Sequence, residues 1–343
     1  MSAGNNFYKN DLRELSFVLF EQFGFGQVAG SAPFEAWGAD EAKAVLQETY
    51  RFAREVLGPL NATGDREGCR VEEGQVKTPR GFKEAWKGIY EGGFKTLSID
   101  PSHGGQGAPL MLQVLVEELL SGANVAFNMY PGLSYGAAEV IAEFGTAEQQ
   151  HLYVERMLNG TWGGTMCLTE PQAGSDVGAA KTTAKKNADG TYNLRGTKIF
   201  ISGGDHDLAE NIIHLVLARI EGAAPGTKGL SLFIVPRNEI GADGKAGKNN
   251  DVQVAGIEHK MGINASATCQ LNFGESGACV GELVGSAENV GMAQMFRMMN
   301  GARIAVGLQG LAVASSAFRY AEDATDTPCR PTEMRAPFII RNI

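Results

Sequence analysis

The apolar residues of this chain change their spacing twice, and this limits the folds open to it. Between residues 39 and 160 they recur every three or four positions, as on one face of a helix. Between residues 161 and 278 short apolar runs are separated by Gly, Pro and Asn, which is typical of strands. Helical spacing returns from Ala287. We therefore expect an α+β protein with an all-α N-terminal bundle, a small middle β-barrel or sandwich, and the start of a C-terminal helical bundle.

The two ends of the chain differ from these parts. Residues 1–38 form an N-terminal extension, in which Leu12, Leu15 and Leu19 have helical spacing before a Gly-rich stretch. This extension either packs on the core or frays. Residues 279–322 form the first helix of the C-terminal domain. Residues 323–343 contain three prolines and no apolar period, so we expect this tail to end the helix.

Five helices are expected between residues 39 and 160. Two have turn signals at their ends: one begins at Asp40 and stops at Gly58-Pro59, and one runs from Thr78-Pro79 to Gly92-Gly93. A third and a fourth cover residues 110–120 and 136–144. A capping box of Thr146 and Gln149 begins the fifth. These five helices are expected to bury one another.

The middle part begins with a hairpin signal. Asp189-Gly190 lies between the Thr-containing run at 181–186 and the alternating run at 191–202, which predicts two antiparallel strands. Three further strands are expected at HLVLARI, LSLFIVP and CQLNFGE.

Composition excludes several classes of protein. The net charge of −9 and the pI near 5.2 argue against a nucleic-acid surface, so an anionic ligand must be met by a local basic group. The five cysteines and five histidines have no disulfide or zinc spacing, so no metal is expected. The first residues, MSAGNNFYKNDLREL, do not show the basic-then-apolar pattern of a secretion signal, and no apolar run approaches the length of a membrane span. A cytoplasmic protein is the expectation.

One stretch, MCLTEPQAGSD from Met166 to Asp176, is the strongest candidate for a binding site. It has an apolar lead-in, hydroxyls at Thr169 and Ser175, a rigid Glu170-Pro171 step, and Gly174 where a ligand can approach the backbone. Such a loop presents N–H groups and hydroxyls to a flat cofactor that carries phosphates. The strand KIFISGG is expected to lie against it.

Two other features favour structure over function. SHGGQG at 102–107 is not followed by the Lys and Ser/Thr that complete a phosphate-binding loop, so it is interpreted as a turn with a solvated His103. The stripe of Met292, Met295, Met299, Ala302 and Val306 is typical of core packing. Arg303 differs, because a cation on an apolar helix needs an anionic partner, such as a carboxylate or a ligand phosphate.

The MCLTEPQAGSD string resembles the flavin-binding signature of the acyl-CoA dehydrogenases. Four further blocks occur in the family's order: GFKTLSIDPSHGGQG, KGLSLFIVP, KMGINASATCQLNFGE and MNGARIAVGLQGLAVASSAFRYA. The resemblance covers roughly residues 40–322 and is strongest to the bacterial branch that contains the 3-methylmercaptopropionyl-CoA dehydrogenases. It implies FAD as cofactor and a short or medium acyl-CoA, or 3-methylthiopropanoyl-CoA, as substrate.

The resemblance also assigns residues. Those implied to border FAD are Met166, Cys167, Leu168, Thr169, Gly174, Ser175, Phe200, Ile201 and Ser202. Those implied to meet acyl-CoA are Ser175, Asn300 and Arg303. Many relatives have Trp at the position of Phe200 and Asp at the position of Asn300. Members of the family are homo-oligomers, and they pass electrons to an electron-transfer flavoprotein or to oxygen.

The family reaction is α,β-dehydrogenation, in which a carboxylate removes the α-proton while the β-hydrogen leaves as hydride to the flavin. The helices that carry this carboxylate in the family are not matched here, so no catalytic residue is assigned, and Glu170 is expected to be structural. Three hypotheses follow: a flavin-dependent acyl-CoA dehydrogenase, a non-catalytic FAD or acyl-CoA binding remnant, and a nucleic-acid-associated flavoprotein. The acidic balance counts against the third.

Overall fold

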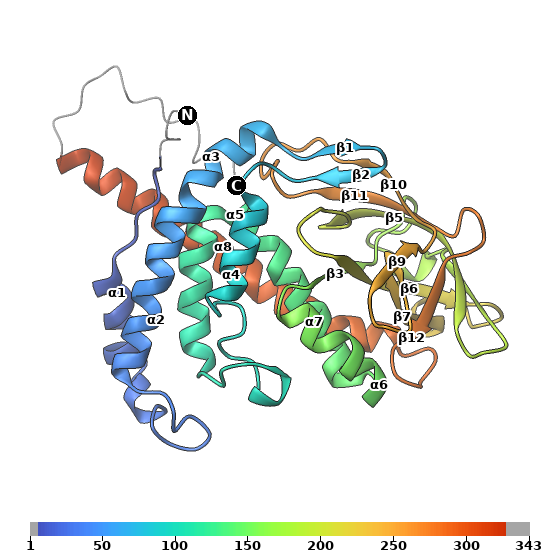
Figure 1. Cartoon of the computed structure of the whole chain (residues 1–343), viewed down its shortest axis with the longest axis horizontal. Helices are drawn as coiled ribbons and strands as arrows, with labels where there is room; N and C mark the ends of the chain where they lie inside the picture. The colour runs from blue at the N-terminus through green and yellow to red at the C-terminus, as the bar shows by residue number, and fades with distance from the viewer. Residues whose placement is uncertain (1–5, 327–343) are drawn as a thin grey trace.

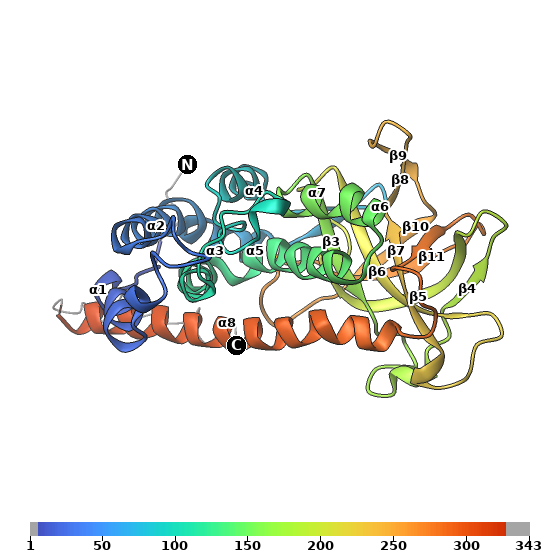
Figure 2. The same ribbon diagram turned by 90° about the horizontal axis from the view of Figure 1, so that it is seen from below.

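The computed structural model describes residues 6–326, with side chains to residue 322. Helices form one end of the molecule and a β domain the other, and the last helix runs beneath both (Figures 1 and 2). The expected tail at 323–343 lies outside the described side chains, and only the helical backbone of 323–326 is described. No helix within residues 6–326 has the length and apolarity needed to cross a membrane.

Within residues 6–326, the helical end contains seven α-helices and several short helical turns, and an eighth α-helix follows the β domain. The α-helices are α1 Leu12–Ser16, α2 Ala39–Phe52, α3 Gly58–Glu67, α4 Phe82–Glu91, α5 Leu110–Phe144, α6 Ala147–Gln149, α7 Glu155–Leu158 and α8 Gly291–Asp326. π-Helical or 3₁₀ turns cover Phe17–Gln22, Phe25–Gln27, Ala53–Leu57, Pro101–His103, Gln150–Val154, Val177–Ala179 and Thr227–Gly229.

Two of the helix predictions are wrong about where a helix ends. The helical chain does not stop at Gly58-Pro59, because Pro59 lies in the first turn of α3, where a missing N–H costs little. The third and fourth helices are both longer than predicted, and they meet within α5 at a kink at the non-helical Asn124 (φ −158°, ψ 86°). The Asn124 side chain repairs this break, since its Oδ1 accepts from the Phe127 N–H at 3.0 Å and its Nδ2 donates to the Leu57 carbonyl at 3.3 Å.

Other helix signals hold in part. The capping box of Thr146 and Gln149 is present at the start of α6, so that prediction is confirmed. The first residue of α2 follows Gly38, and no side chain caps it, so Asp40 is not the cap. The N-terminal extension packs on the bundle, because Leu15, Leu19 and Phe25 are buried in its core.

The β domain is an eight-stranded sheet with two small hairpins beside it. Its strands are β3 Trp162–Cys167, β4 Thr183–Lys186, β5 Tyr192–Ser202, β6 Asn211–Ile220, β7 Leu230–Pro236, β10 Val252–Ile257, β11 Thr268–Phe273 and β12 Val280–Leu283. The hairpins are β1 Arg70–Glu72 with β2 Gln75–Lys77, and β8 Asn238–Ile240 with β9 Ala246–Asn249.

The sheet curls on itself. Its order is β10-β11-β5-β12-β7-β6-β3, and β4 bonds to both β5 and β6. The end of β3 returns to β5, where the Ile199 N–H donates to the Thr169 carbonyl at 2.9 Å. The Asp189-Gly190 hairpin joins β4 and β5 in antiparallel register, and Gly190 has the positive φ (89°) that such a turn requires. This domain is the predicted small β-barrel, with its own apolar core.

The long α8 lies against α5 and the sheet (Figure 2). Met295 and Met298 are buried there, and Met292 and Met299 are partly buried, so the first half of the methionine stripe is core, as expected. The prediction is wrong for the second half of the stripe, because Val306 is 62% exposed. Ile304, Leu311 and Phe318 are exposed on the same half of the helix.

Two aspartates join the helical end to the β domain. Asp205 forms an ion pair with Arg237 at 2.7 Å and accepts from the Val76 N–H at 2.7 Å. Asp207 accepts from both the N–H and the hydroxyl of Thr78, at 3.0 and 2.8 Å. These bonds fix the β1–β2 hairpin and the entry to α4 against the segment after β5.

Candidate functional site

The loop from Met166 to Asp176 leaves the barrel at the end of β3. Side chains alternate along it: Met166 and Leu168 are partly exposed, whereas the Cys167 thiol is buried in the barrel core. Burial raises the pKa of this thiol to about 12, so it stays protonated. Cys167 was predicted to border a cofactor, and only its main chain remains available for such a contact.

The loop then makes a tight turn. Glu170 and Ala173 exchange backbone hydrogen bonds of 3.1 and 3.0 Å, which closes the Pro171-Gln172 turn. A Cβ placed on Gly174 would meet nothing within 4 Å, so the space above this residue is open. Ser175 and Asp176 are exposed, and Thr169 is partly exposed. The hydroxyls and the free backbone of this loop therefore face outward.

The facing segment is the end of β5, and it carries a bulge. Cys269 pairs with Ile201 and Leu271 pairs with Lys198, so two residues of β5 oppose one residue of β11. Phe200 lies in this bulge with a φ of +58°, which is uncommon for a residue with a side chain, and it is 58% exposed. Ile201 is buried and Ser202 is partly exposed. The bulge thus turns an aromatic ring outward beside the loop.

A buried ion pair joins the loop to β5. The Lys198 Nζ lies 2.8 Å from the Glu170 Oε1, and the two side chains are 0% and 3% exposed. Burial by itself raises the pKa of the Glu170 carboxyl, but Lys198 and the hydrogen-bond donors around it outweigh burial and lower this pKa to about 2. Glu170 is therefore a paired carboxylate and is not a proton acceptor at neutral pH, as the sequence interpretation expected.

The two residues predicted on α8 contact each other. The Arg303 Nη1 donates to the Asn300 Oδ1 at 3.0 Å, and the guanidinium lies 5.7 Å from the centre of the Phe296 ring. Both side chains are exposed. Within residues 6–322, no hydrogen bond or ion pair joins either of them to Ser175, so the structure does not bring the two parts of the predicted substrate site into direct contact.

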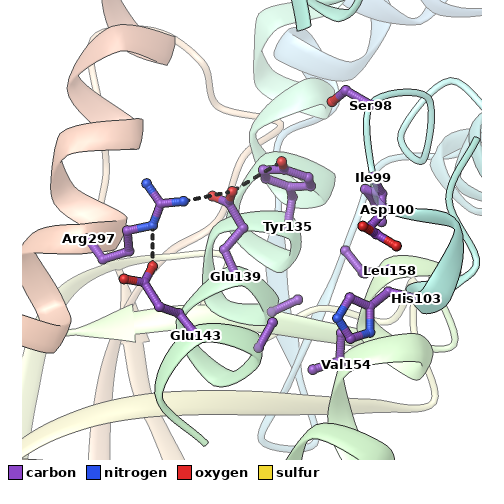
Figure 3. Close-up of a pocket in the computed structure, with 12 residues that line it drawn as sticks. Ser98, Ile99, Asp100, His103, Tyr135, Glu139, Glu143, Val154, Leu158 and Arg297 are labelled. Atoms are coloured by element: carbon purple, nitrogen blue, oxygen red, sulfur yellow. Dashed lines mark hydrogen bonds and ion pairs between the residues drawn. The ribbon is translucent and has the colours of Figure 1, made fainter. Parts of the chain in front are cut away.

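A cavity of about 320 Å³ with both polar and apolar lining lies between α5, α7 and the Ser98–His103 turn (Figure 3). Arg297 of α8 lies at one wall, 2.6 Å from the Glu143 Oε2 and 3.6 Å from the Glu139 Oε1. The Tyr135 hydroxyl donates to Glu139 at 3.2 Å. Burial raises the pKa of Glu139, although Arg297 opposes this shift.

The sequence interpretation missed this cavity. Tyr135, Glu139 and Glu143 are spaced four apart, and this spacing could have predicted that they share one face of a helix. Their partner Arg297 is more than 150 residues away, so the sequence gives no sign of the contact. His103, expected to be a solvated loop side chain, lines the opposite wall of the cavity (Figure 3). The SHGGQG turn is otherwise as expected, with Gly104 at a φ of 79°.

A helical layer, a curled β domain with a hydroxyl-bearing loop at the end of β3, and a long helix beneath both define the fold of the acyl-CoA dehydrogenases. Two family models match the chain: the acyl-CoA dehydrogenase N-terminal domain over residues 39–161 and the acyl-CoA dehydrogenase middle domain over residues 165–276. The chain belongs to the acyl-CoA dehydrogenase family.

Known proteins agree with this assignment. The chain is 40% identical, over 92% of its length, to the 3-methylmercaptopropionyl-CoA dehydrogenase of Ruegeria pomeroyi, and 38% identical, also over 92%, to a butyryl-CoA dehydrogenase of Syntrophomonas wolfei. The crystal structure of an acyl-CoA dehydrogenase complexed with FAD from Bacillus anthracis superposes with a TM-score of 0.65 at 26% identity, covering 82% of this chain and 43% of that one. The chain spans about half of the two relatives, 53% of each.

Proposed function

We propose that this chain forms the flavin-facing part of an FAD-dependent acyl-CoA dehydrogenase that acts by α,β-dehydrogenation of an acyl-CoA thioester. The observation that carries the proposal is the pairing of the Thr169–Ser175 loop with the bulged end of β5. It leaves hydroxyls, open backbone at Gly174 and the exposed ring of Phe200 on the same part of the barrel. These groups fit a flat ring system with a polar edge and a pyrophosphate.

The residues of the loop and of β5 have separate tasks in this proposal. The Thr169 hydroxyl binds the polar edge of the flavin, and Ser175 lies near the pyrophosphate and the thioester. Phe200 and Ser202 cover the opposite approach and exclude water. Main-chain groups of the other predicted residues, Met166, Cys167, Leu168, Gly174 and Ile201, border the same cofactor. Bound FAD would supply the two-electron acceptor, and the protein supplies alignment.

On α8, Asn300 and Arg303 are proposed to meet the CoA portion. Arg303 is exposed and contacts only a neutral amide and an aromatic ring among the described side chains, so its charge is available to a phosphate. The relatives named for 3-methylmercaptopropionyl-CoA and butyryl-CoA favour a short or medium acyl chain. An electron-transfer flavoprotein is the proposed electron acceptor, and a homo-oligomer is the proposed assembly.

A second candidate function is binding of FAD and acyl-CoA without turnover by this chain alone. The observation that favours it concerns Glu170 in the Met166–Asp176 loop, which we call the flavin loop. Its buried carboxylate is held as an anion by Lys198 and backbone donors. A carboxylate with a pKa near 2 is a poor base. Glu170 is therefore not assigned as the catalytic base.

A titration tests the substrate part of the proposal. The chain is saturated with FAD, and butyryl-CoA, octanoyl-CoA and palmitoyl-CoA are added while the flavin absorbance is recorded. We expect perturbation of the band with a preference for the two shorter thioesters. Arg303→Gln should weaken this binding about tenfold, because one charge-assisted contact is lost. The matched control is Arg195→Gln, an exposed arginine on β5. Equal weakening in both variants, or an optimum at palmitoyl-CoA, would contradict the proposal.

A further inference from the structure

Lys198 is buried in an unusual way for a lysine. Its side chain is 0% exposed, and its ammonium group donates to the Glu170 Oε1 at 2.8 Å and to the Leu168 carbonyl at 3.1 Å. Burial lowers the pKa of Lys198, while Glu170 opposes this shift. One lysine thus holds two points of the flavin loop, the residue before Thr169 and the residue after it.

Glu170 extends the same connection to a third segment. Its Oε2 accepts from the Lys181 N–H and the Gln172 amide, each at 2.7 Å, and its Oε1 also accepts from the Thr182 N–H at 3.0 Å. Lys181 and Thr182 lead into β4, which pairs with β5. A single carboxylate therefore joins the flavin loop, β5 and the start of β4.

The Glu170–Lys198 pair lies directly beside the residues proposed to border FAD. Thr169 and Ile199 form the neighbouring contact, a backbone hydrogen bond of 2.9 Å, and the next residue of β5 is the bulged, outward-facing Phe200. The Glu170–Lys198 ion pair and the Thr169–Ile199 hydrogen bond together fix the loop against the end of β5. They therefore set where Thr169 and Ser175 lie relative to Phe200 and Ser202.

Stability alone gives little reason for charges at this place. Removing a lysine and a glutamate from water costs free energy that their attraction repays only in part, and apolar residues of similar volume often serve a fold equally well. A buried pair is better suited to select one arrangement of segments, because wrong arrangements leave a buried charge without a partner.

We propose that Glu170 and Lys198 are positioning residues that set the spacing between the Thr169–Ser175 loop and the Phe200–Ser202 segment, and that FAD affinity depends on this spacing. The inference rests on the proposed function, since it concerns the same cofactor. Neither residue is proposed to touch the reacting atoms. Their effect passes through the loop and the strand that they join.

Three variants test the proposal. Glu170→Asp keeps the charge but shortens the side chain by one methylene. Lys198→Met breaks the pair, and Glu170→Gln with Lys198→Met replaces it by a neutral pair of similar volume. The control is Lys186→Met with Glu288→Gln, which removes an exposed ion pair of 3.1 Å between β4 and the segment before α8. Thermal unfolding is measured first, so that the later readouts are taken at a temperature where each chain is folded.

The first readout is the FAD dissociation constant, and the second is amide hydrogen exchange of residues 168–176 in the flavin-free chain. In Glu170→Asp and in the neutral double variant we expect FAD binding at least tenfold weaker and faster exchange in the loop, with the control within twofold of the wild type. A purely structural role would lower the unfolding temperature and leave both readouts of the folded chain unchanged.

The outcomes separate the two claims. Unchanged exchange and unchanged FAD affinity in folded variants would overturn the positioning role. Failure of all three variants to fold would also overturn it, because the pair would then be required for the fold itself. If the wild-type chain does not bind FAD, the proposed function fails. Faster exchange in the variants would then still show that the Glu170–Lys198 pair fixes the loop. Unchanged exchange would show that the pair does not fix the loop.

Discussion

Thr165 of β3 and His214 of β6 are register partners in the buried parallel pair, and the Thr165 Oγ1 lies 2.8 Å from the His214 Nδ1. The ring is fully buried, edge-on to Phe273. Burial, with Arg237 and His206 nearby, lowers the pKa of His214 to about 3. His206 is also buried, and burial and Arg237 lower its pKa to about 3. Both rings are neutral in the folded chain at physiological pH.

These histidines make the fold sensitive to acid. In the unfolded chain a histidine takes up a proton as the pH falls below about 6.5, whereas in the folded chain His214 does so only near pH 3. The unfolded state therefore binds more protons in this window, and each histidine removes about 1.4 kcal/mol of stability per pH unit below about pH 6.

Between pH 6 and pH 5, we expect the free energy of unfolding of His214→Gln to fall by about 1.4 kcal/mol less than that of the wild type. The variant keeps a polar partner for Thr165 but has no ring to titrate. Urea unfolding at pH 7, 6 and 5 measures this difference. The exposed His259→Gln is the control and should follow the wild type. Parallel stability curves for the wild type and His214→Gln would contradict the assignment of a neutral buried ring.

The α8 helix offers a test of where the core ends. Met295 is fully buried against α5 and the sheet, so Met295→Ala should lower the free energy of unfolding by about 2–5 kcal/mol. Val306 lies about three turns further along the same helix and is exposed. Val306→Lys should therefore change the free energy of unfolding by less than about 0.5 kcal/mol. Denaturant unfolding distinguishes the two, and a tolerated Met295→Ala would show that α8 does not dock as described.

Sequence patterns predicted the β domain better than the helical end, for a physical reason. The strands carry period-two alternation and a hairpin turn, both of which are local signals. The extent of α5 is not a local signal: residues 121–135 lie outside the predicted helices, yet α5 includes them, and the polar side chain at its kink, Asn124, donates to the Leu57 carbonyl far away in the sequence. Tertiary contacts thus extend the helices beyond what the local pattern predicts.

Glu170 gives a prediction about catalysis. Its carboxylate is engaged by Lys198 and by the N–H groups of Lys181 and Thr182, so it is not free to take a proton from a thioester. We expect that this chain, saturated with FAD and kept anaerobic, does not bleach its flavin absorbance when butyryl-CoA is added. Rapid bleaching would contradict this, and its loss in Glu170→Gln would then identify Glu170 as the base.

The candidate site shows the same division between local and distant signals. The MCLTEPQAGSD motif located the loop because its hydroxyls, glycine and proline are adjacent in the sequence. The pairing of Glu170 with Lys198 crosses 28 residues, and the contact of Arg297 with Glu139 joins two different helices. Neither has a spacing rule that a sequence pattern can express, because both depend on how the barrel closes and how α8 docks.

The central claim is that the loop after β3 and the bulged end of β5 together bind FAD. The most direct measurement is a titration of the chain with FAD, followed by quenching of flavin fluorescence, for the wild type and for a variant with alanine at Thr169, Ser175 and Ser202. We predict saturation at about one FAD per chain with weak affinity, and at least tenfold weaker binding in the variant, since each lost hydrogen bond contributes about 1 kcal/mol. Thr183→Ala on the exposed side of β4 should bind as the wild type does. No saturable binding by the wild type, or equal binding by the triple variant, would contradict the claim.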